Sequence, residues 1–388
     1  MSKVNDLNEW MMTEGRESGD PIAVVSHFAS SLIEAGVPLW RANIGQRFAN
    51  PLLVAWGIIW TPEETEVYDV THRLLLTDDY IGSSFETIAR TQQPLHKSLR
   101  DLDPETDHAS YLEFAATGAT DFYATLLSYG DGSRHGCTFA TRAPDGFTPA
   151  HLEMIEAAKP GLSSALEPVT MRKSSRSLLR TYLGDGPSEA VWNGTIQRGE
   201  RRTLDAVVMF SDLRGFTAFS DQASEEDVFE ALDGYFDIVV QAVEEKGGDV
   251  LKFMGDGILS IFPIQAENDR NRQCRAAALA ARSALTNIQS LSDKRKAAGK
   301  NALTIGVGLN AGQVSYGNIG SSGRLDFTVV GGTVNLASRV ERLTKSTGYD
   351  ALATALVANA APDLFLPIGP KSVRGLPEPL EVFALRPG

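Results

Sequence analysis

Two aspartates in the second half of the chain have the residue type and the sequence context of metal ligands. Asp212 ends an apolar run, residues 205–213, that is typical of a buried strand. Asp256 lies between Gly255 and Gly257, and this tip joins two short β-rich segments that predict a hairpin. If the hairpin lies beside the first strand, the two carboxylates converge and could hold Mg²⁺, which prefers oxygen ligands and often shares them with substrate phosphates. Taken alone, Asp256 also fits an ordinary turn residue, because Asp-Gly turns are common.

A second polar pair, Asn335 and Arg339, lies four positions apart on a predicted helix that runs from Thr333 to about Lys345. Residues at this spacing share one face of a helix. An amide and a guanidinium one turn apart at a helix start could bind a ribose and a phosphate, although the same pair also fits an exposed helix face. All six histidines lie before residue 152, so chemistry in the second half must use carboxylates, Lys, Arg, amides and backbone groups.

The elements predicted around these residues alternate between strands and helices. Ser224 is the expected N-cap of a helix that continues to about Lys246, with apolar residues three or four positions apart. The remaining predicted elements are a hairpin around Asp256, a long helix over 267–298, a strand over 303–312, a turn-rich segment to residue 320 and a strand over 325–330.

Length and composition limit the classes of protein that this chain can belong to. Its 388 residues suit two domains, and its formal net charge of −13 argues against binding to nucleic acid or to an anionic membrane. Cys137 and Cys274 are far apart, which excludes a disulfide scaffold and a cysteine-based zinc site. We find no membrane span and no signal sequence, and therefore expect a cytoplasmic protein.

Four segments of the second half resemble the catalytic domain of class III nucleotidyl cyclases. They are VVMFSDLRGFTAFSD, GGDVLKFMGDGILSIFP, IGVGLNAGQVSYGNIGSSGRLDFTVVGGTVNLASRVERL and VRGLPEPLEVFAL, which cover about residues 203–385 in the family's order and spacing. The resemblance implies an α+β fold, an α/β sandwich of the ferredoxin-like palm type. It also implies a homodimer with active sites at the interface of the two subunits.

The resemblance assigns metal and phosphate ligands. Asp212 and Asp256 correspond to the two metal-binding aspartates, and the backbone carbonyl of Leu213 to a further ligand, for two Mg²⁺ (or Mn²⁺) ions in each active site. Backbone amides of the turn after Leu213 would bind the β- and γ-phosphates. The residues of this turn that are expected to bind substrate are Gly215, Phe216 and Thr217.

The resemblance also assigns the residues that contact the nucleoside and the α-phosphate. Lys252 and Thr328 fall at the two base-contacting positions, Asn335 at the ribose-orienting asparagine, and Arg339 at the arginine that stabilises charge on the α-phosphate. Lysine can donate to N1 of adenine, and the threonine hydroxyl can accept from the exocyclic amine. Guanine reverses this pattern, so the expected substrate is ATP.

The predicted function is therefore that of an adenylate cyclase, in which two metals assist attack of the ribose 3′-hydroxyl on the α-phosphate. A catalytically silent nucleotide-binding module and a guanylate cyclase are the alternatives. The silent module is suggested by Gly332, where the family usually has aspartate. Asn310 replaces a common histidine, and Lys345 is a weak match for the lysine that contacts the terminal phosphates. A diguanylate cyclase is disfavoured because its Gly-Gly-Asp/Glu-Glu-Phe signature is absent.

The sequence predicts a regulatory domain over residues 1–168, a helical linker over 169–203 and the catalytic domain over 204–388. A helix, strands, a hairpin and a terminal helix are expected in the first part, an order that resembles a GAF domain with an unknown small ligand or protein as its input. Four aromatic side chains could line a pocket, or could lie in the core or in a dimer interface: Trp40, Trp56, Trp60 and Tyr68. Either of two histidines could bind haem or be structural: His96 and His135.

Overall fold

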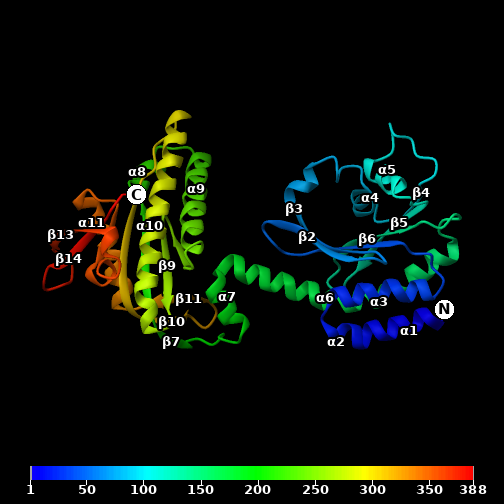
Figure 1. Ribbon diagram of the computed structural model, residues 1–388, viewed down its shortest axis with the longest axis horizontal. Coiled ribbons are helices and arrows are strands. Elements are labelled where there is room, and N and C mark those ends of the chain that lie inside the picture. The colour runs from blue at the N-terminus through cyan, green and yellow to red at the C-terminus, as the bar shows by residue number, and fades with distance from the viewer. Residues whose placement is uncertain (1, 388) are drawn as a thin grey trace. The chain divides into compact units, whose positions relative to one another are not determined.

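The computed structural model describes residues 2–387, apart from the side chain of residue 267, and consists of two units. Unit 1 comprises Met1–Thr181 and unit 2 comprises Tyr182–Gly388, each with its own β-sheet (Figure 1). The boundary falls inside the segment 169–203 expected to be a linker. The mixed α and β class predicted from the sequence is confirmed. No helix within residues 2–387 combines the length and the hydropathy that a bilayer crossing requires.

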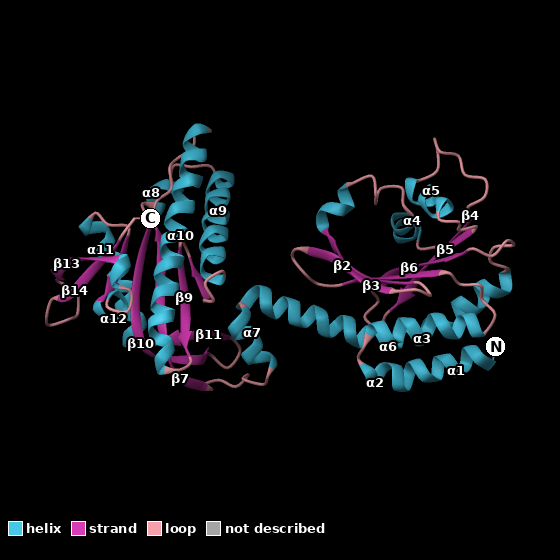
Figure 2. Ribbon diagram, in the orientation of Figure 1, coloured by secondary structure: helices cyan, strands magenta, loops and turns pink. Residues whose placement is uncertain are grey.

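Unit 1 is built on a six-stranded antiparallel sheet in the order β3-β2-β1-β6-β5-β4. Helices α1, α3 and α6 cover one face, whereas α4 and α5 lie on the other (Figure 2). The strands are β1 (Arg41–Arg47), β2 (Leu53–Trp60), β3 (Thr65–Thr71), β4 (Leu95–Ser98), β5 (Asp121–Ser128) and β6 (Arg134–Thr141). The helices are α1 (Ser2–Trp10), η1 (Met11–Gly15), α2 (Arg16–Ser18), α3 (Pro21–Glu34), η2 (His72–Leu76), α4 (Ser84–Thr91), α5 (Ala109–Ala116) and α6 (Pro149–Leu183).

Strand β1 shows how the sequence divides the two faces of this sheet. Ala42 and Ile44 are buried in the core against α3 and α6, whereas Arg41 and Asn43 face the side of α4 and α5. This alternation follows from the two-residue period of a strand. Strand β1 therefore presents Arg41 and Asn43 on one face of the sheet.

Helix α6 runs through residues 168 and 169, where the sequence predicts that the terminal helix of the regulatory domain gives way to a separate linker. The structure has a single helix, although it contains Pro160 and Pro168. Proline removes a backbone donor and tends to kink a helix. A buried stripe continues past both prolines at helical spacing, so tertiary packing keeps the helix continuous; its members include Ile155, Leu162, Ala165 and Thr170.

The aromatic residues and histidines of unit 1 have separate structural roles. Trp56 and Trp60 lie in the core, 2% and 6% exposed, and Trp40 stacks on Arg142. His96 bonds Asp121 Oδ2 at 2.8 Å. His135 is buried; its Nδ1 accepts the backbone amide of Arg47 at 3.0 Å and its Nε2 contacts Ser133 Oγ at 2.8 Å. These contacts support the structural interpretation of both histidines.

Unit 2 contains an eight-stranded sheet in the order β13-β14-β12-β10-β7-β9-β8, with β11 paired to β10. All pairs are antiparallel except β10 with β12. The strands are β7 (Arg201–Leu213), β8 (Asp249–Met254), β9 (Gly257–Ile264), β10 (Ile305–Gly320), β11 (Leu325–Val330), β12 (Ala351–Thr354), β13 (Phe365–Lys371) and β14 (Leu380–Leu385). The helices are α7 (Asp185–Trp192), α8 (Phe216–Ser220), α9 (Glu225–Glu244), η3 (Glu267–Asp269), α10 (Arg270–Ala297), α11 (Gly332–Thr347), α12 (Ala355–Ala358) and η4 (Pro362–Leu364).

Strand β7 lies in the middle of this sheet and is buried on both faces. Val207 and Met209 pack under α9 and α10, whereas Ala206 and Val208 face the cluster that includes Ala337 of α11. A strand covered on both faces reads as a continuous apolar run. This is why the run before Asp212 correctly predicted a buried strand.

Strand β10 is longer than predicted, because residues 312–320 continue it instead of forming turns. The glycines of β10 allow other segments of the chain to lie close to its backbone. A Cβ on Gly312 would lie 2.8 Å from Thr333 Oγ1, and one on Gly317 would collide with the backbone of Glu200. Glycine therefore marks crowding between backbone segments here, which sequence alone does not distinguish from a turn.

Candidate active site

The structure brings Asp212 and Asp256 together at one edge of the unit 2 sheet. Asp212 ends β7, and Asp256 lies in the turn between β8 and β9. Asp212 is opposite Gly257 in the β7–β9 ladder, and the amide of Leu213 donates to the backbone carbonyl of Asp256 at 3.2 Å. The β8–β9 hairpin therefore lies beside the 205–213 strand, as the proposed metal site requires.

Electrostatics at this edge favour a bound cation. Burial raises the pKa of Asp256 above its usual range, and the Asp212 carboxylate raises it further, because two nearby negative charges oppose ionisation. Lys345 Nζ lies 3.2 Å from Asp212 Oδ2 and partly offsets this charge. The pair thus has the charge that a divalent metal would neutralise.

The donor set fits a hard metal ion that shares ligands with its substrate. Among the described residues, no three or more His, Cys, Asp and Glu side chains gather in a metal-binding group. Two carboxylates and the carbonyl of Leu213 leave several coordination positions for water and phosphate oxygens. Mg²⁺ commonly binds through one or two carboxylates together with substrate phosphates.

Glu341 of α11 lies behind this edge, and the sequence analysis did not single it out. Its side chain is 5% exposed, and its Oε1 has no hydrogen-bond partner. Burial raises the pKa of Glu341, and the charge of Asp212 raises it further. It fits here because Gly306, opposite Asp212 in β10, has no side chain: a Cβ there would lie 2.6 Å from Glu341 Oε1.

The turn after β7 contains the expected phosphate-binding amides. Gly215 adopts the left-handed conformation, φ 70°, that glycine favours. The amide of Arg214 donates to the carbonyl of Thr304 at 2.9 Å, and its guanidinium to that of Tyr349 at 2.8 Å. Arg214 therefore anchors the turn, so its amide is not a free donor for phosphate. A cavity of 310 Å³ adjoins the turn, with Gly215, Phe216, Phe219 and Leu303 among its lining residues.

Lys252 of β8 lies against β11, the strand that carries Thr328. Its ammonium group pairs with the carboxylate of Asp326. Asp326 and Thr328 are two residues apart on β11 and so share one face of the strand. The two expected base contacts therefore converge, and Asp326 joins them. Asp326 was not predicted from the sequence, although its two-residue spacing from Thr328 was a usable signal.

Helix α11 carries Asn335 and Arg339, and its start is fixed by buried polar contacts. Asn310 is 3% exposed; its Nδ2 donates to the carbonyl of Thr333 at 2.9 Å, and its Oδ1 accepts from Thr354 Oγ1 at 2.9 Å. The asparagine that replaces a common histidine thus ties β10 and β12 to the first turn of α11. Asn335 is exposed in that turn.

The guanidinium of Arg339 lies beside the loop between β13 and β14. A Cβ on Gly375 would lie 3.2 Å from its Nη1. Arg374 is the next residue in this loop and is exposed. The loop therefore adds a second arginine near Arg339, which the sequence analysis did not identify.

Within one chain, the expected site residues form groups at different ends of α11. Lys345 contacts Asp212, whereas Asn335 lies ten residues earlier on the same helix. At 1.5 Å per residue, this corresponds to about 15 Å along the helix axis. Among the described residues, no hydrogen bond or ion pair joins the two aspartates to Lys252, Thr328, Asn335 or Arg339.

Comparison with known proteins identifies similarities to unit 2. Residues 200–349 match the family described as the adenylate and guanylate cyclase catalytic domain. The chain is 32% identical over 200 residues to an adenylate cyclase of Anabaena cylindrica, covering 49% of this chain and 38% of that protein. It is 29% identical over 183 residues to adenylate cyclase 1 of Rhizobium meliloti (strain 1021), covering 46% and 27%. The chain thus spans less than two fifths of each relative's length.

A solved structure of a bacterial light-regulated adenylyl cyclase is similar over 68% of this chain and 86% of its own, with a TM-score of 0.50 and 20% identity. At this identity the likeness concerns the fold alone. It agrees with a mixed α and β architecture.

Proposed function

Because residues 200–349 match the family described as the adenylate and guanylate cyclase catalytic domain, we propose that the chain converts ATP to 3′,5′-cyclic AMP and pyrophosphate. The observation that carries the choice of ATP is the position of Lys252 against the strand face of Thr328 and Asp326. The family match supports cyclase activity, and our proposal adds selectivity for adenine over guanine.

The base-binding face supplies the hydrogen bonds that adenine needs. The Lys252 ammonium can donate to adenine N1, and the Thr328 hydroxyl can accept from the exocyclic amine. Asp326 holds the lysine by its ion pair, which orients the ammonium before the base arrives. Guanine would place its N1–H donor towards the lysine, so that two donors would face each other and guanine would bind more weakly.

The reaction forms a bond between the ribose 3′-oxygen and the α-phosphorus and breaks the bond to pyrophosphate. Asp212, Asp256 and the carbonyl of Leu213 would hold two Mg²⁺ or Mn²⁺ ions, which when bound supply Lewis-acid activation of the 3′-hydroxyl and charge neutralisation of the phosphates. Asn335 would orient the ribose, and Arg339 would bind the α-phosphate as negative charge builds there.

The polyphosphate would be bound by backbone and arginine donors. Amides of Gly215, Phe216 and Thr217 can donate to the β- and γ-phosphates, because backbone N–H groups in such a turn form an anion-binding concavity. Arg374 is a further candidate for the terminal phosphates, since it lies one residue from the contact with Arg339. Departure of pyrophosphate would depend on these contacts.

We further propose a homodimer in which each site uses Asp212 and Asp256 of one subunit and the Lys252, Thr328, Asn335 and Arg339 set of the other. The separation of Asn335 from Asp212 along α11 supports this arrangement. A twofold axis would then create two complete sites from two incomplete halves.

Unit 1 is proposed to be a GAF-like regulatory domain over residues 1–168 that acts through the segment 169–203 on the catalytic domain over 204–388, in a cytoplasmic protein. Its input would be a small ligand or another protein. Helix α6 continues into that segment, which supports a mechanical connection.

The test is an assay of cyclic product from the purified full-length chain with ATP or GTP, in Mg²⁺ and in Mn²⁺. We expect cyclic AMP, and a loss of about 10³-fold in Asp212→Asn. Asp293→Asn, an exposed aspartate on α10, is the matched control and should retain activity. Cyclic GMP as the main product would replace this proposal by a guanylate cyclase, and no product under any condition would favour the silent module that Gly332 suggests.

A further inference from the structure

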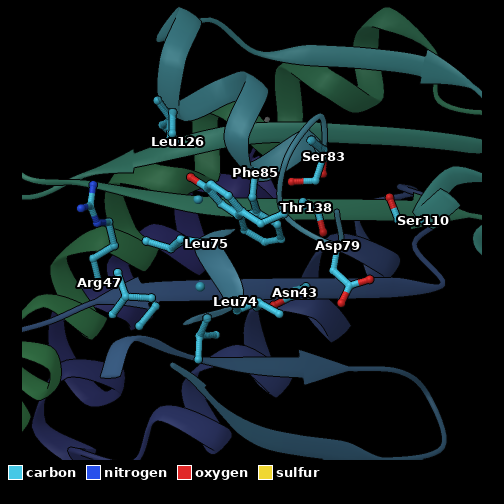
Figure 3. A pocket seen from close by; sticks show the side chains of 18 of the residues that line it. Asn43, Arg47, Leu74, Leu75, Asp79, Ser83, Phe85, Ser110, Leu126 and Thr138 are labelled. Atoms are coloured by element: carbon cyan, nitrogen blue, oxygen red, sulfur yellow. The ribbon is translucent and has the colours of Figure 1, made fainter. Parts of the chain in front are cut away.

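Unit 1 contains a cavity of 380 Å³ on the sheet face that bears α4 and α5. Its volume lies within the usual range for small-molecule sites. In Figure 3, Phe85 projects into the middle, Arg47 lies at one end, and Asp79, Ser83 and Ser110 lie towards the other. The lining comes from β1, β2, β3, β5, β6, η2, α4 and α5, so the cavity is formed within one unit.

Glycines in the sheet let aromatic rings lie directly on the strands beneath this cavity. A Cβ on Gly136 would lie 2.6 Å from Phe85 Cδ1, and one on Gly45 would lie 3.3 Å from Phe85 Cε1. Likewise, the ring of Tyr68 rests on Gly57, where a Cβ would lie 2.5 Å from Tyr68 Cζ. Side chains at these positions would displace the rings into the open space.

Arg41 is a charged donor in this lining without a carboxylate partner. Its guanidinium lies over the Phe114 ring, 4.9 Å from the centroid, and no described Asp or Glu forms an ion pair with it. Burial lowers the pKa of Arg41, whereas the charge of Glu66, which forms no ion pair with it, acts in the opposite direction. A half-buried guanidinium without an ion pair has lost part of its water, so a ligand anion would offset this cost.

Asn43 adds a second donor on the same face of β1, two residues from Arg41. Its side chain is 8% exposed, and its Oδ1 accepts the Tyr68 hydroxyl at 2.6 Å. This bond fixes the amide with its Nδ2, which has no partner among the described residues, as the remaining donor. Arg41 and Asn43 thus offer neighbouring donors to one acceptor group.

We propose that this cavity binds a small aromatic carboxylate, with its ring among Phe85, Phe114 and Phe122 and its carboxylate on Arg41 and Asn43. A planar carboxylate suits the fork of a guanidinium. A single negative charge suits the site better than a dianion, because Asp79 also lines the cavity. Arg47 and Arg134 are exposed lining residues whose positive charge attracts an anion in a chain that is acidic overall.

The first test compares two probes of nearly equal shape, 2-naphthoate and 2-naphthamide, by isothermal titration calorimetry on the full-length chain. We expect the acid to bind at least ten-fold more tightly than the amide, since a hydrogen bond to a charged group is worth about 1.5–3 kcal/mol. Equal affinities, or no binding of either probe at millimolar concentration, would overturn the proposal. This comparison requires no variant and does not depend on cyclase activity.

The second test locates the carboxylate. Arg41→Gln should weaken binding of 2-naphthoate at least ten-fold and leave the amide within about two-fold. Arg142→Gln is the matched control, because Arg142 also stacks on an aromatic ring, Trp40, but does not line the cavity. Unfolding midpoints would show whether each variant folds, and Arg41→Lys, which keeps the charge, should recover part of the affinity. Unchanged 2-naphthoate binding in folded Arg41→Gln would refute the assignment.

Discussion

The two units differ in how their candidate sites are assembled. In unit 1, Arg41 and Asn43 occupy alternate positions of one strand, and adjacent strands and helices of the same unit complete the cavity. In unit 2, the aspartate pair and the nucleoside-binding residues belong to groups that no described contact joins, and Asn335 lies about 15 Å along α11 from Lys345, which contacts Asp212. The first site can thus bind a ligand as a monomer, whereas the second is proposed to need a partner.

The difference shows what each site can respond to. A cavity formed within one unit is sensitive to local changes in its lining and to the stability of its sheet. A site divided between subunits is also sensitive to how the subunits meet, so a regulatory input can alter activity without touching a catalytic side chain. This gives a physical basis for the proposed control of unit 2 through the segment 169–203.

The largest expected effect comes from dividing the proposed active site between two variants. Asp212→Ala and Arg339→Ala should each lower cyclase activity by about 10²–10³-fold. When the two variants are co-expressed, half of the dimers are mixed, and each mixed dimer has one intact site. The expected activity is therefore about one quarter of that of the wild type. Product formation by the unfractionated co-expressed protein would measure it, and mixed dimers isolated by tandem purification should reach about one half of the wild-type activity.

The control for this experiment mixes two variants of the same group, Asp212→Ala with Asp256→Ala. Neither subunit then supplies an intact aspartate pair, so no activity should return. If the Asp212→Ala and Arg339→Ala mixture is no more active than either variant alone, each site is contained in one chain, and the contrast between the units disappears.

A smaller effect concerns the pH dependence of stability in unit 1. Burial lowers the pKa of His135 to about 4, from 6.5. Between these values the unfolded chain binds more protons than the folded one, so stability is fully present above pH 6.5 and is lost as the pH falls towards 4. At pH 5 the expected loss is about 2 kcal/mol relative to pH 8.

Unit 2 should respond in the opposite direction, because it lacks histidine and contains buried carboxyl groups with raised pKa values. Burial raises the pKa of Asp249 and of Glu341 above 3.8 and 4.5 respectively. Protonation of these groups in mild acid stabilises the folded state.

The expectation for unit 1 can be tested by urea unfolding followed by tryptophan fluorescence, which reports mainly on this unit because it holds Trp10, Trp40, Trp56 and Trp60. His135→Gln should flatten the pH dependence of the stability of unit 1, whereas His72→Gln, at an exposed position, should not. Equal slopes of stability against pH in the two variants would contradict the assignment to His135.

Sequence patterns predicted the elements of unit 2 well where burial gives a clear period. The run before Asp212 and the Gly-Asp-Gly tip became β7 and the β8–β9 hairpin, and the 224–246 prediction became α9. Patterns failed where packing over long range decides. Pro160 and Pro168 did not end α6, and the glycines of β10 reflect the approach of Thr333 and Glu200.

Prediction of the candidate active site from the sequence succeeded and failed in the same way. Asp212 and Asp256 converge as their contexts suggested. Asp326 and Glu341 were not predicted, because the role of each depends on a residue distant in sequence. Asp326 pairs with Lys252, and Glu341 is affected by the charge of Asp212. In unit 1, Arg41 resembles any surface arginine in the sequence; only the folded sheet shows it within a cavity.

The smallest expected effect tests Gly332, at the first turn of the helix that carries Asn335. Nothing lies within 4 Å of a Cβ placed on Gly332, and its backbone is not left-handed. Gly332→Asp should therefore stabilise unit 2 by about 0.5 kcal/mol, because a carboxylate at a helix N-terminus complements the helix dipole. Gly331→Asp is the matched control: with φ 148°, that residue occupies a region that L side chains rarely adopt, and the variant should be destabilised. Urea unfolding of both variants measures the difference. If Gly332→Asp loses as much stability as Gly331→Asp, the first turn of α11 has no room for the carboxylate that the cyclase family usually has there, and Gly332 is required by the local structure of this chain.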